Sequence, residues 1–336
     1  MPLIEAVPNF SLGPNHPALK QISRTLSLDS RVCLLHQDSG LDANRTVFTL
    51  VGEPKPLLER IVAAVELALS LVDFETHQGN HPKVGVLDVC PLIPLCEISL
   101  GETIGYSKQL GATLARQFGL PVFFYQQSAS TEKNRELSFI RQGGLEALGK
   151  RIQQGEMTPD LGPQQIDPHK GVSVVGVRSL MVAYNINLQS ATLEQAKALA
   201  AQLRALRGSD SRLAAVRFLG WYLEEHQTAQ ISTNVMDLKA LRVGQLFRQV
   251  TTEAQKMGLE VSGSELVGMC PLAALVDLSA RDPQEQAKIQ VQQLGLDAFG
   301  PFCLDDKVIE LALIKQGHLS EARSLLGDQV SLDSLI

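Results

Sequence analysis

Apolar and polar residues alternate along the chain in a pattern that predicts the same series of strands and helices twice. In the first half, short apolar segments rich in β-branched residues predict four strands. These segments are residues 3–7, 32–35, 45–51 and 84–89. One helix is predicted to begin at 17–22, and a second follows Pro56, where apolar residues recur at helical spacing from Leu57 to Val72. The predicted order is β-α-β-β-α-β.

The second half repeats this order. Strands are predicted at 180–188, 213–222, 228–236 and 259–267. A capping-box pattern at 192–195 begins one helix, and a second helix is predicted over 241–257. The triplet Cys-Pro-Leu follows the last strand of both halves, at 90–92 and 270–272. We therefore predict an α/β (α+β) fold of two ferredoxin-like βαββαβ subdomains, related by an internal repeat, with a ligand cleft between them.

The first half also contains additional segments. A capping-box pattern at 99–102 predicts a helix to residue 118, and a strand is predicted at 121–125. Residues 131–153 are predicted to be mostly helical, and the Pro- and Gly-rich segment 158–171 to be a loop. That loop is either a linker or part of a ligand site. The predicted domains are residues 1–170 and 171–314, followed by a short polar tail at 315–336.

Composition excludes several classes of protein. The chain has 336 residues, 44% of them hydrophobic, and a formal net charge of -6, which argues against a nucleic-acid-binding surface. No apolar run is long enough for a membrane span, and the N-terminus lacks the basic region of a signal peptide. The five cysteines are scattered without a Cys-x-x-Cys pair. We therefore expect a cytoplasmic protein without a disulfide framework or structural zinc site.

Two histidines, His77 and His81, stand out in a Gly- and Pro-containing segment that leads toward an apolar strand with Asp88. Their i, i+4 spacing suits metal ligation on a helix, but Gly79 and Pro82 argue against a helix there. Histidine also suits general acid/base catalysis, because its pKa lies close to neutral pH. The alternative is that both are exposed loop residues. No phosphate-binding loop, dinucleotide fingerprint or nucleophile-elbow motif is present.

Other polar residues allow a functional and a structural interpretation. The segment 38–45 (DSGLDANR) contains two carboxylates, an amide and an arginine, and reads either as a carboxylate-binding loop or as an ordinary turn. Asn185 and Asn187 lie on one face of a predicted strand, and Asn234 lies in a later one. Because Asn is disfavoured in strands, this face either points to solvent or lines a polar cavity.

Several segments in order resemble the formiminotransferase family, the folate-dependent glutamate formimidoyltransferases. They are residues 5–11, 44–52, 77–91, 159–163, 184–188, 220–223, 232–234 and 295–297. The resemblance extends to roughly Leu313. It implies transfer of a formimino group from N-formimidoyl-L-glutamate to N5 of tetrahydrofolate as co-substrate, in histidine degradation and one-carbon metabolism. It also implies two α/β subdomains, usually in a homodimer.

The resemblance also suggests site residues. His81 corresponds to the catalytic histidine, with Asp38 or Asp88 as its supporting carboxylate, and no metal is expected. The family's folate-binding loop falls on Gly162, Pro163, Gln164, Gln165, Ile166, Asp167, Pro168, His169, Lys170 and Gly171. Asn44 and Arg45 are expected to bind substrate, with Arg45 holding a carboxylate. Asn185, Asn187 and Asn234 are expected to recognise the pterin edge.

Three positions depart from the family pattern. Asn80 replaces a common glutamate beside His81, Lys83 a common arginine and Val86 a common alanine. Loss of a carboxylate beside His81 is expected to lower its proton affinity. The alternatives are therefore formyl transfer from 5-formyltetrahydrofolate to glutamate, use of formimidoyl-glycine, or a non-catalytic folate-binding protein. Because no cyclodeaminase domain follows, a separate cyclodeaminase is expected to process the product.

Overall fold

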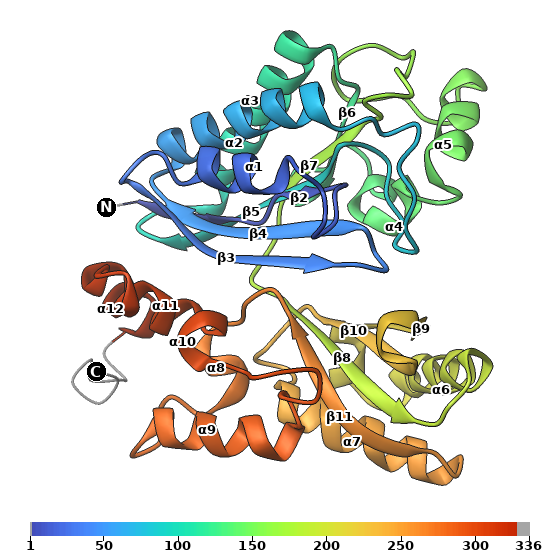
Figure 1. Ribbon diagram of the computed structural model, residues 1–336, viewed down its shortest axis with the longest axis vertical. Helices are drawn as coiled ribbons and strands as arrows, with labels where there is room; N and C mark the ends of the chain where they lie inside the picture. Colours follow the sequence, from blue (N-terminus) through green and yellow to red (C-terminus); the bar gives the residue numbers. More distant parts are fainter. Residues whose placement is uncertain (1, 328–336) are drawn as a thin grey trace. The chain divides into compact units, whose positions relative to one another are not determined.

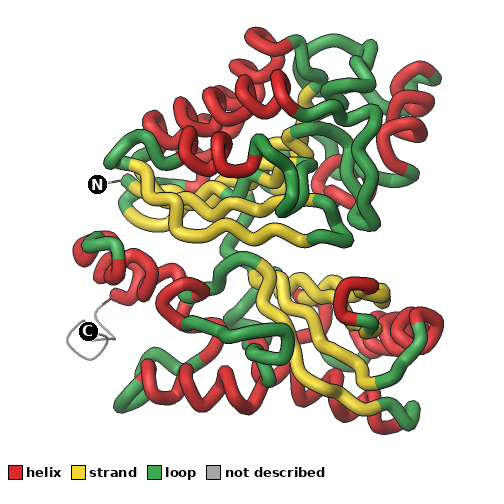
Figure 2. Tube along the Cα trace, in the orientation of Figure 1, coloured by secondary structure: helices red, strands yellow, loops and turns green. Residues whose placement is uncertain are grey.

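The structure is a computed structural model that describes residues 2–327. The chain forms two compact units, the first ending at Arg178 and the second beginning at Ser179. Each unit has its own β-sheet with helices packed against it, as the ribbon and the secondary-structure colouring show (Figures 1 and 2). The predicted mixed α/β class with two domains is confirmed.

The sheet of unit 1 combines an antiparallel and a parallel part. Its strands are β1 (Leu3–Ala6), β2 (Asn9–Phe10), β3 (Val32–Gly40), β4 (Arg45–Gly52), β5 (Leu87–Cys96), β6 (Val122–Gln126) and β7 (Ser173–Val177). β1 and β2 lie between β4 and β5, antiparallel to both, and β3 pairs with the other side of β4. β7 pairs in parallel with β5 on one side and with β6 on the other.

Three long or amphipathic helices cover one face of this sheet: α1 (Leu19–Leu26), α2 (Pro54–Leu71) and α3 (Leu100–Phe118) (Figure 1). Ser99 caps α3 through the predicted capping box with Glu102. The segment between β6 and β7 forms a 3-10 turn (Lys133–Arg135) and the helices α4 (Leu137–Ile140) and α5 (Gly144–Gln153). It is therefore broken into short pieces rather than one continuous helix.

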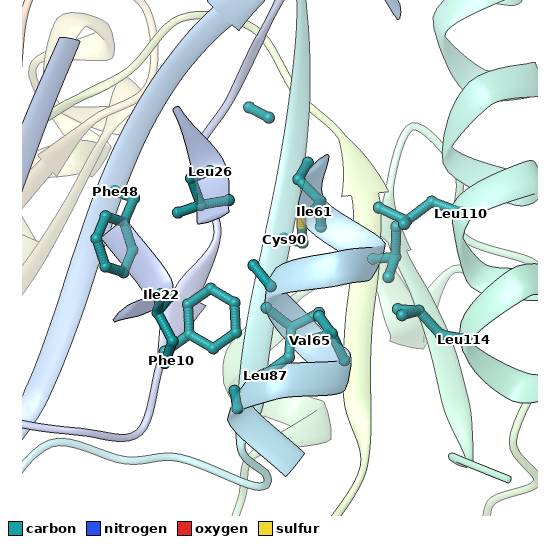
Figure 3. Packing of buried hydrophobic residues seen from close by; sticks show 14 of the residues in the cluster. Phe10, Ile22, Leu26, Phe48, Ile61, Val65, Leu87, Cys90, Leu110 and Leu114 are labelled. Carbon is teal, nitrogen blue, oxygen red and sulfur yellow. The ribbon is translucent and has the colours of Figure 1, made fainter. Parts of the chain in front are cut away.

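The core of unit 1 lies between these helices and the sheet (Figure 3). Phe10 and Phe48 meet edge to face, with ring centroids 5.9 Å apart. Aliphatic side chains from α1, α2, α3 and β5 belong to the same cluster, and the labelled ones are Ile22, Leu26, Ile61, Val65, Leu87, Leu110 and Leu114. Each large apolar side chain that is fully buried contributes about 1.5–3 kcal/mol. This packing fixes β4 and β5, which carry the polar residues described below.

Unit 2 contains β8 (Val182–Gln189), α6 (Leu193–Ala205), β9 (Val216–Leu223), β10 (Thr228–Val235), α7 (Val243–Lys256) and β11 (Glu260–Val267). Its sheet order is β11-β8-β10-β9, all antiparallel. As in unit 1, the first strand lies between the closing strand and the third strand. Further helices follow: α8 (Leu272–Leu275), α9 (Pro283–Leu294), α10 (Leu304–Lys307), α11 (Ile309–Lys315) and α12 (Leu319–Leu326).

Three sequence-based expectations differ from the structure. The strand predicted at 84–89 begins only at Leu87 and continues to Cys96, through Pro91 and Pro94. β3 continues to Gly40 rather than ending at 35. β7 was not predicted, and because it lies inside the first sheet, unit 1 extends to Arg178 rather than ending at 170. The loop at 158–171 therefore lies within unit 1 and does not link the two units. Of the predicted tail, residues 328–336 lie outside the described part of the chain.

Candidate functional site

The loop that carries His77 and His81 packs against the turn between β3 and β4. The Asn80 amide donates to the carbonyl of Asp42 at 2.9 Å, and Asn44 Nδ2 donates to the carbonyl of Gln78 at 2.6 Å. A Cβ on Gly79 would lie 2.3 Å from the carbonyl oxygen of Ala43, so the two backbones approach as closely as only glycine allows. These contacts fix the loop immediately before His81.

The hydrogen bonds of His81 define its tautomer. Nδ1 lies 2.8 Å from the carbonyl oxygen of Pro82, and Nε2 lies 3.4 Å from Nη1 of Arg45. Because a carbonyl only accepts and a guanidinium only donates, Nδ1 carries the hydrogen and Nε2 presents its lone pair. His81 is therefore neutral in this arrangement, with a basic nitrogen directed at a cation.

Asp88 anchors this cluster from the start of β5. Its carboxylate is fully buried and accepts the backbone N–H of Val84 at 3.0 Å. Arg141 grips it with two donors, Nε at 3.2 Å from Oδ1 and Nη2 in a very short contact with Oδ2. Arg45 Nη2 lies 3.4 Å from the same Oδ2. Asp88 thus reaches His81 through Arg45, and its role as a supporting carboxylate stays a prediction.

Burial and the two arginines together suppress protonation of the imidazole. Desolvation lowers the pKa of His81 well below its ordinary 6.5, and the positive charges of Arg45 and Arg141 lower it further. Burial also lowers the pKa of Arg45 to about 10, partly offset by Asp88, so Arg45 remains a cation at neutral pH. Lys83, which donates to the carbonyl of Gly79 at 3.0 Å, has its pKa lowered by burial as well. The cluster carries net positive charge.

An open pocket of about 570 Å³ adjoins the loop that leads to His81. Its walls come from residues 13–17, from the turn at 41–44 and from residues 78–80. Most of the polar lining is uncharged at neutral pH, since it consists of amides such as Asn15, Asn44 and Asn80, and Asp42 adds a carboxylate. A pocket of this size and polarity suits a small polar ligand.

Comparison with known proteins gives the family of the chain. Residues 3–178 match the N-terminal subdomain of the formiminotransferase domain, and residues 183–314 match the formiminotransferase domain. The chain belongs to the formiminotransferase family. The boundary between the two matched regions falls at the boundary between the two compact units.

Relatives differ in length. The chain is 39% identical to formimidoyltransferase-cyclodeaminase of Mus musculus over 94% of its own residues and 60% of that protein. It is 32% identical to glutamate formimidoyltransferase of Streptococcus pyogenes, covering 82% of this chain and 92% of that one. It is 29% identical to glutamate formimidoyltransferase of Thermoplasma acidophilum. The chain thus spans about 60% of the length of the fused mouse relative and most of the shorter bacterial one.

The predicted folate-binding loop, residues 162–171, lies in unit 1 and is partly exposed. Gly162 has a left-handed φ of 84°, and it and residues 163–165 are exposed. The second part is tied to the histidine loop, because the amide of Val86 donates to the carbonyl of Lys170 at 2.9 Å. His169 lies 2.9 Å from Asp73, which raises the pKa of this imidazole. The two predicted loops are therefore neighbours.

The three predicted asparagines lie in unit 2, where their surroundings differ. Asn185 Nδ2 donates to Glu265 Oε2 at 3.1 Å, and Gln230 Nε2 donates to Asn187 Oδ1 at 2.8 Å. Both asparagines are almost fully buried in this network, whereas Asn234 is exposed. Asn185 and Asn187 therefore do not point to solvent, and their amides are bound within a network of protein side chains.

Two further predicted residues have other partners. Asp38 lies in β3, and its Oδ2 is 3.8 Å from Nε2 of His36 on the same strand. His77 stacks on Phe74 with ring centroids 6.0 Å apart, and Asn44 Nδ2 lies 3.5 Å from its Nδ1. Burial lowers the pKa of His77 to about 4, and its Nε2 is buried without a hydrogen-bond partner. His77 is thus not paired with His81.

Sequence reasoning did not identify Arg141. It stands 53 residues after Asp88, in the segment with short helices, and no local motif surrounds it.

Among residues 2–327, no group of three or more His, Cys, Asp or Glu side chains is placed to hold a metal ion. Within the same range, no helix is both long and apolar enough to cross a membrane.

Proposed function

We propose that this formiminotransferase transfers the formimino group of N-formimidoyl-L-glutamate to N5 of tetrahydrofolate, releasing L-glutamate. The observation that carries the proposal is the neutral imidazole of His81, whose unprotonated Nε2 faces Arg45 at the end of a loop that lines an open polar pocket with residues 78–80. Family membership supports the reaction class, since relatives of similar length are named glutamate formimidoyltransferases.

The reaction requires one proton to move between two nitrogens. N5 of tetrahydrofolate attacks the amidine carbon, a tetrahedral intermediate forms, and the bond from that carbon to the glutamate nitrogen breaks. N5 loses its proton and the leaving nitrogen gains one. His81 Nε2 takes the proton from N5 and delivers it to the leaving nitrogen, as general base and then general acid.

The cationic surroundings of His81 serve the second half of this cycle. Once His81 is protonated, Arg45 at 3.4 Å disfavours the imidazolium and promotes return of the proton to the leaving amine. Because Arg45 is already held by Asp88, its first role in this proposal is to orient and tune His81. Asn44 and the pocket beside it are proposed to receive the polar donor substrate.

The other predicted residues are proposed to bind the folate. The loop 162–171 is proposed to bind the folate, with its exposed residues 162–165 available for contact. Asn185, Asn187 and Asn234 of unit 2 are proposed to recognise the pterin edge. We also propose that the chain acts in the cytoplasm as a homodimer, and that a cyclodeaminase consumes the product.

Asn80 motivates the alternative functions. Its side chain is exposed and lines the pocket, where a family member commonly has a glutamate. The alternatives are formyl transfer from 5-formyltetrahydrofolate to glutamate, use of formimidoyl-glycine, and folate binding without catalysis.

The test is a direct assay with purified protein, tetrahydrofolate and N-formimidoyl-L-glutamate, with 5-formimidoyltetrahydrofolate detected by mass. Parallel reactions replace the donor with formimidoyl-glycine, or both substrates with 5-formyltetrahydrofolate and glutamate. Formation of 5-formimidoyltetrahydrofolate from formimidoyl-glutamate supports the proposal. Saturable folate binding without product from any of these substrate pairs would support the non-catalytic alternative.

A further inference from the structure

Among the side chains that bind the buried carboxylate of Asp88, Arg141 makes the shortest contact. Its side chain is 10% exposed, and its Nε and Nη2 atoms bind the two oxygens of Asp88 as a fork. Two-point contacts between arginine and carboxylate fix orientation as well as charge. Asp88 therefore cannot rotate without breaking a contact to Arg141.

A second arginine holds the backbone on which Arg141 stands. Arg151 in α5 donates from Nη1 to the carbonyl of Phe139 at 2.9 Å, and from Nη2 to the carbonyls of Ile140 at 2.8 Å and Gln142 at 3.1 Å. Its guanidinium also lies 5.5 Å from the ring centroid of Phe139. These hydrogen bonds hold the backbone carbonyls on both sides of Arg141. The backbone at the end of α4 therefore fixes the direction of the Arg141 side chain.

A continuous series of contacts then reaches the imidazole. Arg141 binds Asp88, Asp88 Oδ2 lies 3.4 Å from Nη2 of Arg45, and Nη1 of Arg45 lies 3.4 Å from Nε2 of His81. The side chains of Arg45 and Arg141 are 12% and 10% exposed. Since water has little access to this cluster, Asp88 relies on the arginines and the Val84 amide for its orientation.

We propose that Arg141 is a positioning residue of the formimino-transfer site, acting through Asp88 and Arg45 to hold a guanidinium nitrogen against Nε2 of His81. The segment that supplies it, between β6 and β7, has no counterpart between the strands of unit 2. The expected change in kcat rests on the proposed function, whereas the expected shift in the His81 titration does not.

The experiment compares three variants of the full chain. Arg141→Gln removes the charge and the fork, and Arg141→Lys keeps the charge but removes the fork. Arg31→Gln is the matched control, because Arg31 forms the same fork on Asp29 in unit 1 at an exposed position, with Nε–Oδ1 3.0 Å and Nη2–Oδ2 2.8 Å. Each is assayed for kcat and KM, and the His81 imidazole is titrated by NMR, with its signal assigned by its loss in His81→Gln.

We expect kcat to fall roughly hundredfold in Arg141→Gln with little change in KM, as for a displaced catalytic group. The charged groups around His81 are Arg45, Arg141, Lys83 and Asp88, so loss of one cation shifts the His81 titration to higher pH. Arg141→Lys is expected to leave that titration near wild type while kcat falls, which separates position from charge. Arg31→Gln should change neither measurement.

Unchanged kcat and an unchanged His81 titration in Arg141→Gln would overturn the proposal. If Arg141→Gln does not fold, the kcat of Arg141→Lys decides, and a wild-type kcat there counts against a positioning role. A wild-type chain that transfers no formimino group would refute the proposed function alone, since the NMR titration still measures whether Arg141 acts on His81.

Discussion

Nη1 of Arg45 lies 3.4 Å from Nε2 of His81, on the side of the imidazole where the Nε2 lone pair points. A proton on Nε2 would face a cation in a poorly solvated site. The Arg45 cation therefore keeps the His81 imidazole unprotonated near neutral pH and makes the imidazolium a strong proton donor.

The pH dependence of the reaction should reflect this contact. Because the pKa of His81 in the folded chain is well below 6.5, the base form persists as pH falls, and the acid limb of kcat/KM should lie well below pH 6.5. Arg45→Gln removes the nearer cation and should move that limb upward. A profile of kcat/KM against pH for both proteins checks this, and an acid limb at or above pH 6.5 in the wild type would contradict it.

Replacement of His81 should remove the proton-transfer step while sparing the fold. We expect His81→Gln to lower kcat about 10²–10⁴-fold, the usual range for general acid/base catalysis. Its control is His226→Gln, an exposed histidine in unit 2 that stacks on Phe299. Circular dichroism and folate titration should match wild type in both, and a normal kcat in His81→Gln would remove the central role given to this residue.

The close approach of Gly79 to the β3–β4 turn predicts a steric requirement. In Gly79→Ala the new Cβ meets the carbonyl oxygen of Ala43 at 2.3 Å, and backbone cannot move aside as a flexible side chain does. We expect a loss of about 1–3 kcal/mol in the free energy of unfolding and a lower kcat, because the loop before His81 is displaced.

The control for this change is Gly105→Ala in α3, where nothing lies within 4 Å of the new Cβ. That variant should gain up to ~1 kcal/mol from helix propensity. Urea denaturation measures both, and equal stability of the two variants would show that the contact with Ala43 is relaxed at little cost.

His77 should make the fold sensitive to acid. Its pKa is about 4 in the folded chain and 6.5 ordinarily, so the unfolded state binds more protons between these values. Stability therefore rises with pH across this window and is lost as pH falls through it. His77→Phe keeps a ring against Phe74 and removes a buried nitrogen without a partner. Its Tm should fall less than that of wild type between pH 7 and pH 5, and parallel pH curves would contradict this account.

Asn80 tests the departure from the family pattern. Its backbone amide is bound to Asp42, whereas its side chain is exposed, so Asn80→Glu should fold normally. A carboxylate beside His81 should raise the pKa of the imidazole and shift the acid limb of kcat/KM upward. Folate affinity should not change. An unchanged pH profile would mean that residue 80 does not act electrostatically on His81.

Much of the fold was predictable from the sequence because apolar periodicity reports burial directly. The helix after Ser99 and the helix after Thr192 begin where their capping boxes indicate. β7 was missed since its five residues directly follow a Pro- and Gly-rich loop, and only its two parallel neighbours show it to be a central strand.

The site was predicted less completely, for a geometric reason. His81, Arg45 and Asp88 were identified, but sequence did not reveal that Asp88 binds the arginine and not the imidazole. Asp38 was an equally reasonable partner from sequence, and strand β3 places its Oδ2 3.8 Å from Nε2 of His36. Arg141 has no neighbouring motif, and only the tertiary fold brings it to Asp88.

The position of β7 has a consequence for how the chain is made. This strand is the last of unit 1 to leave the ribosome, yet it belongs between β5 and β6, which precede it. Until residues 173–177 emerge, the nascent chain exposes two unpaired strand edges that attract strands from other chains. We therefore expect nascent chains stalled before Ser173 to aggregate or to recruit chaperones, and those that have released Val177 to escape both.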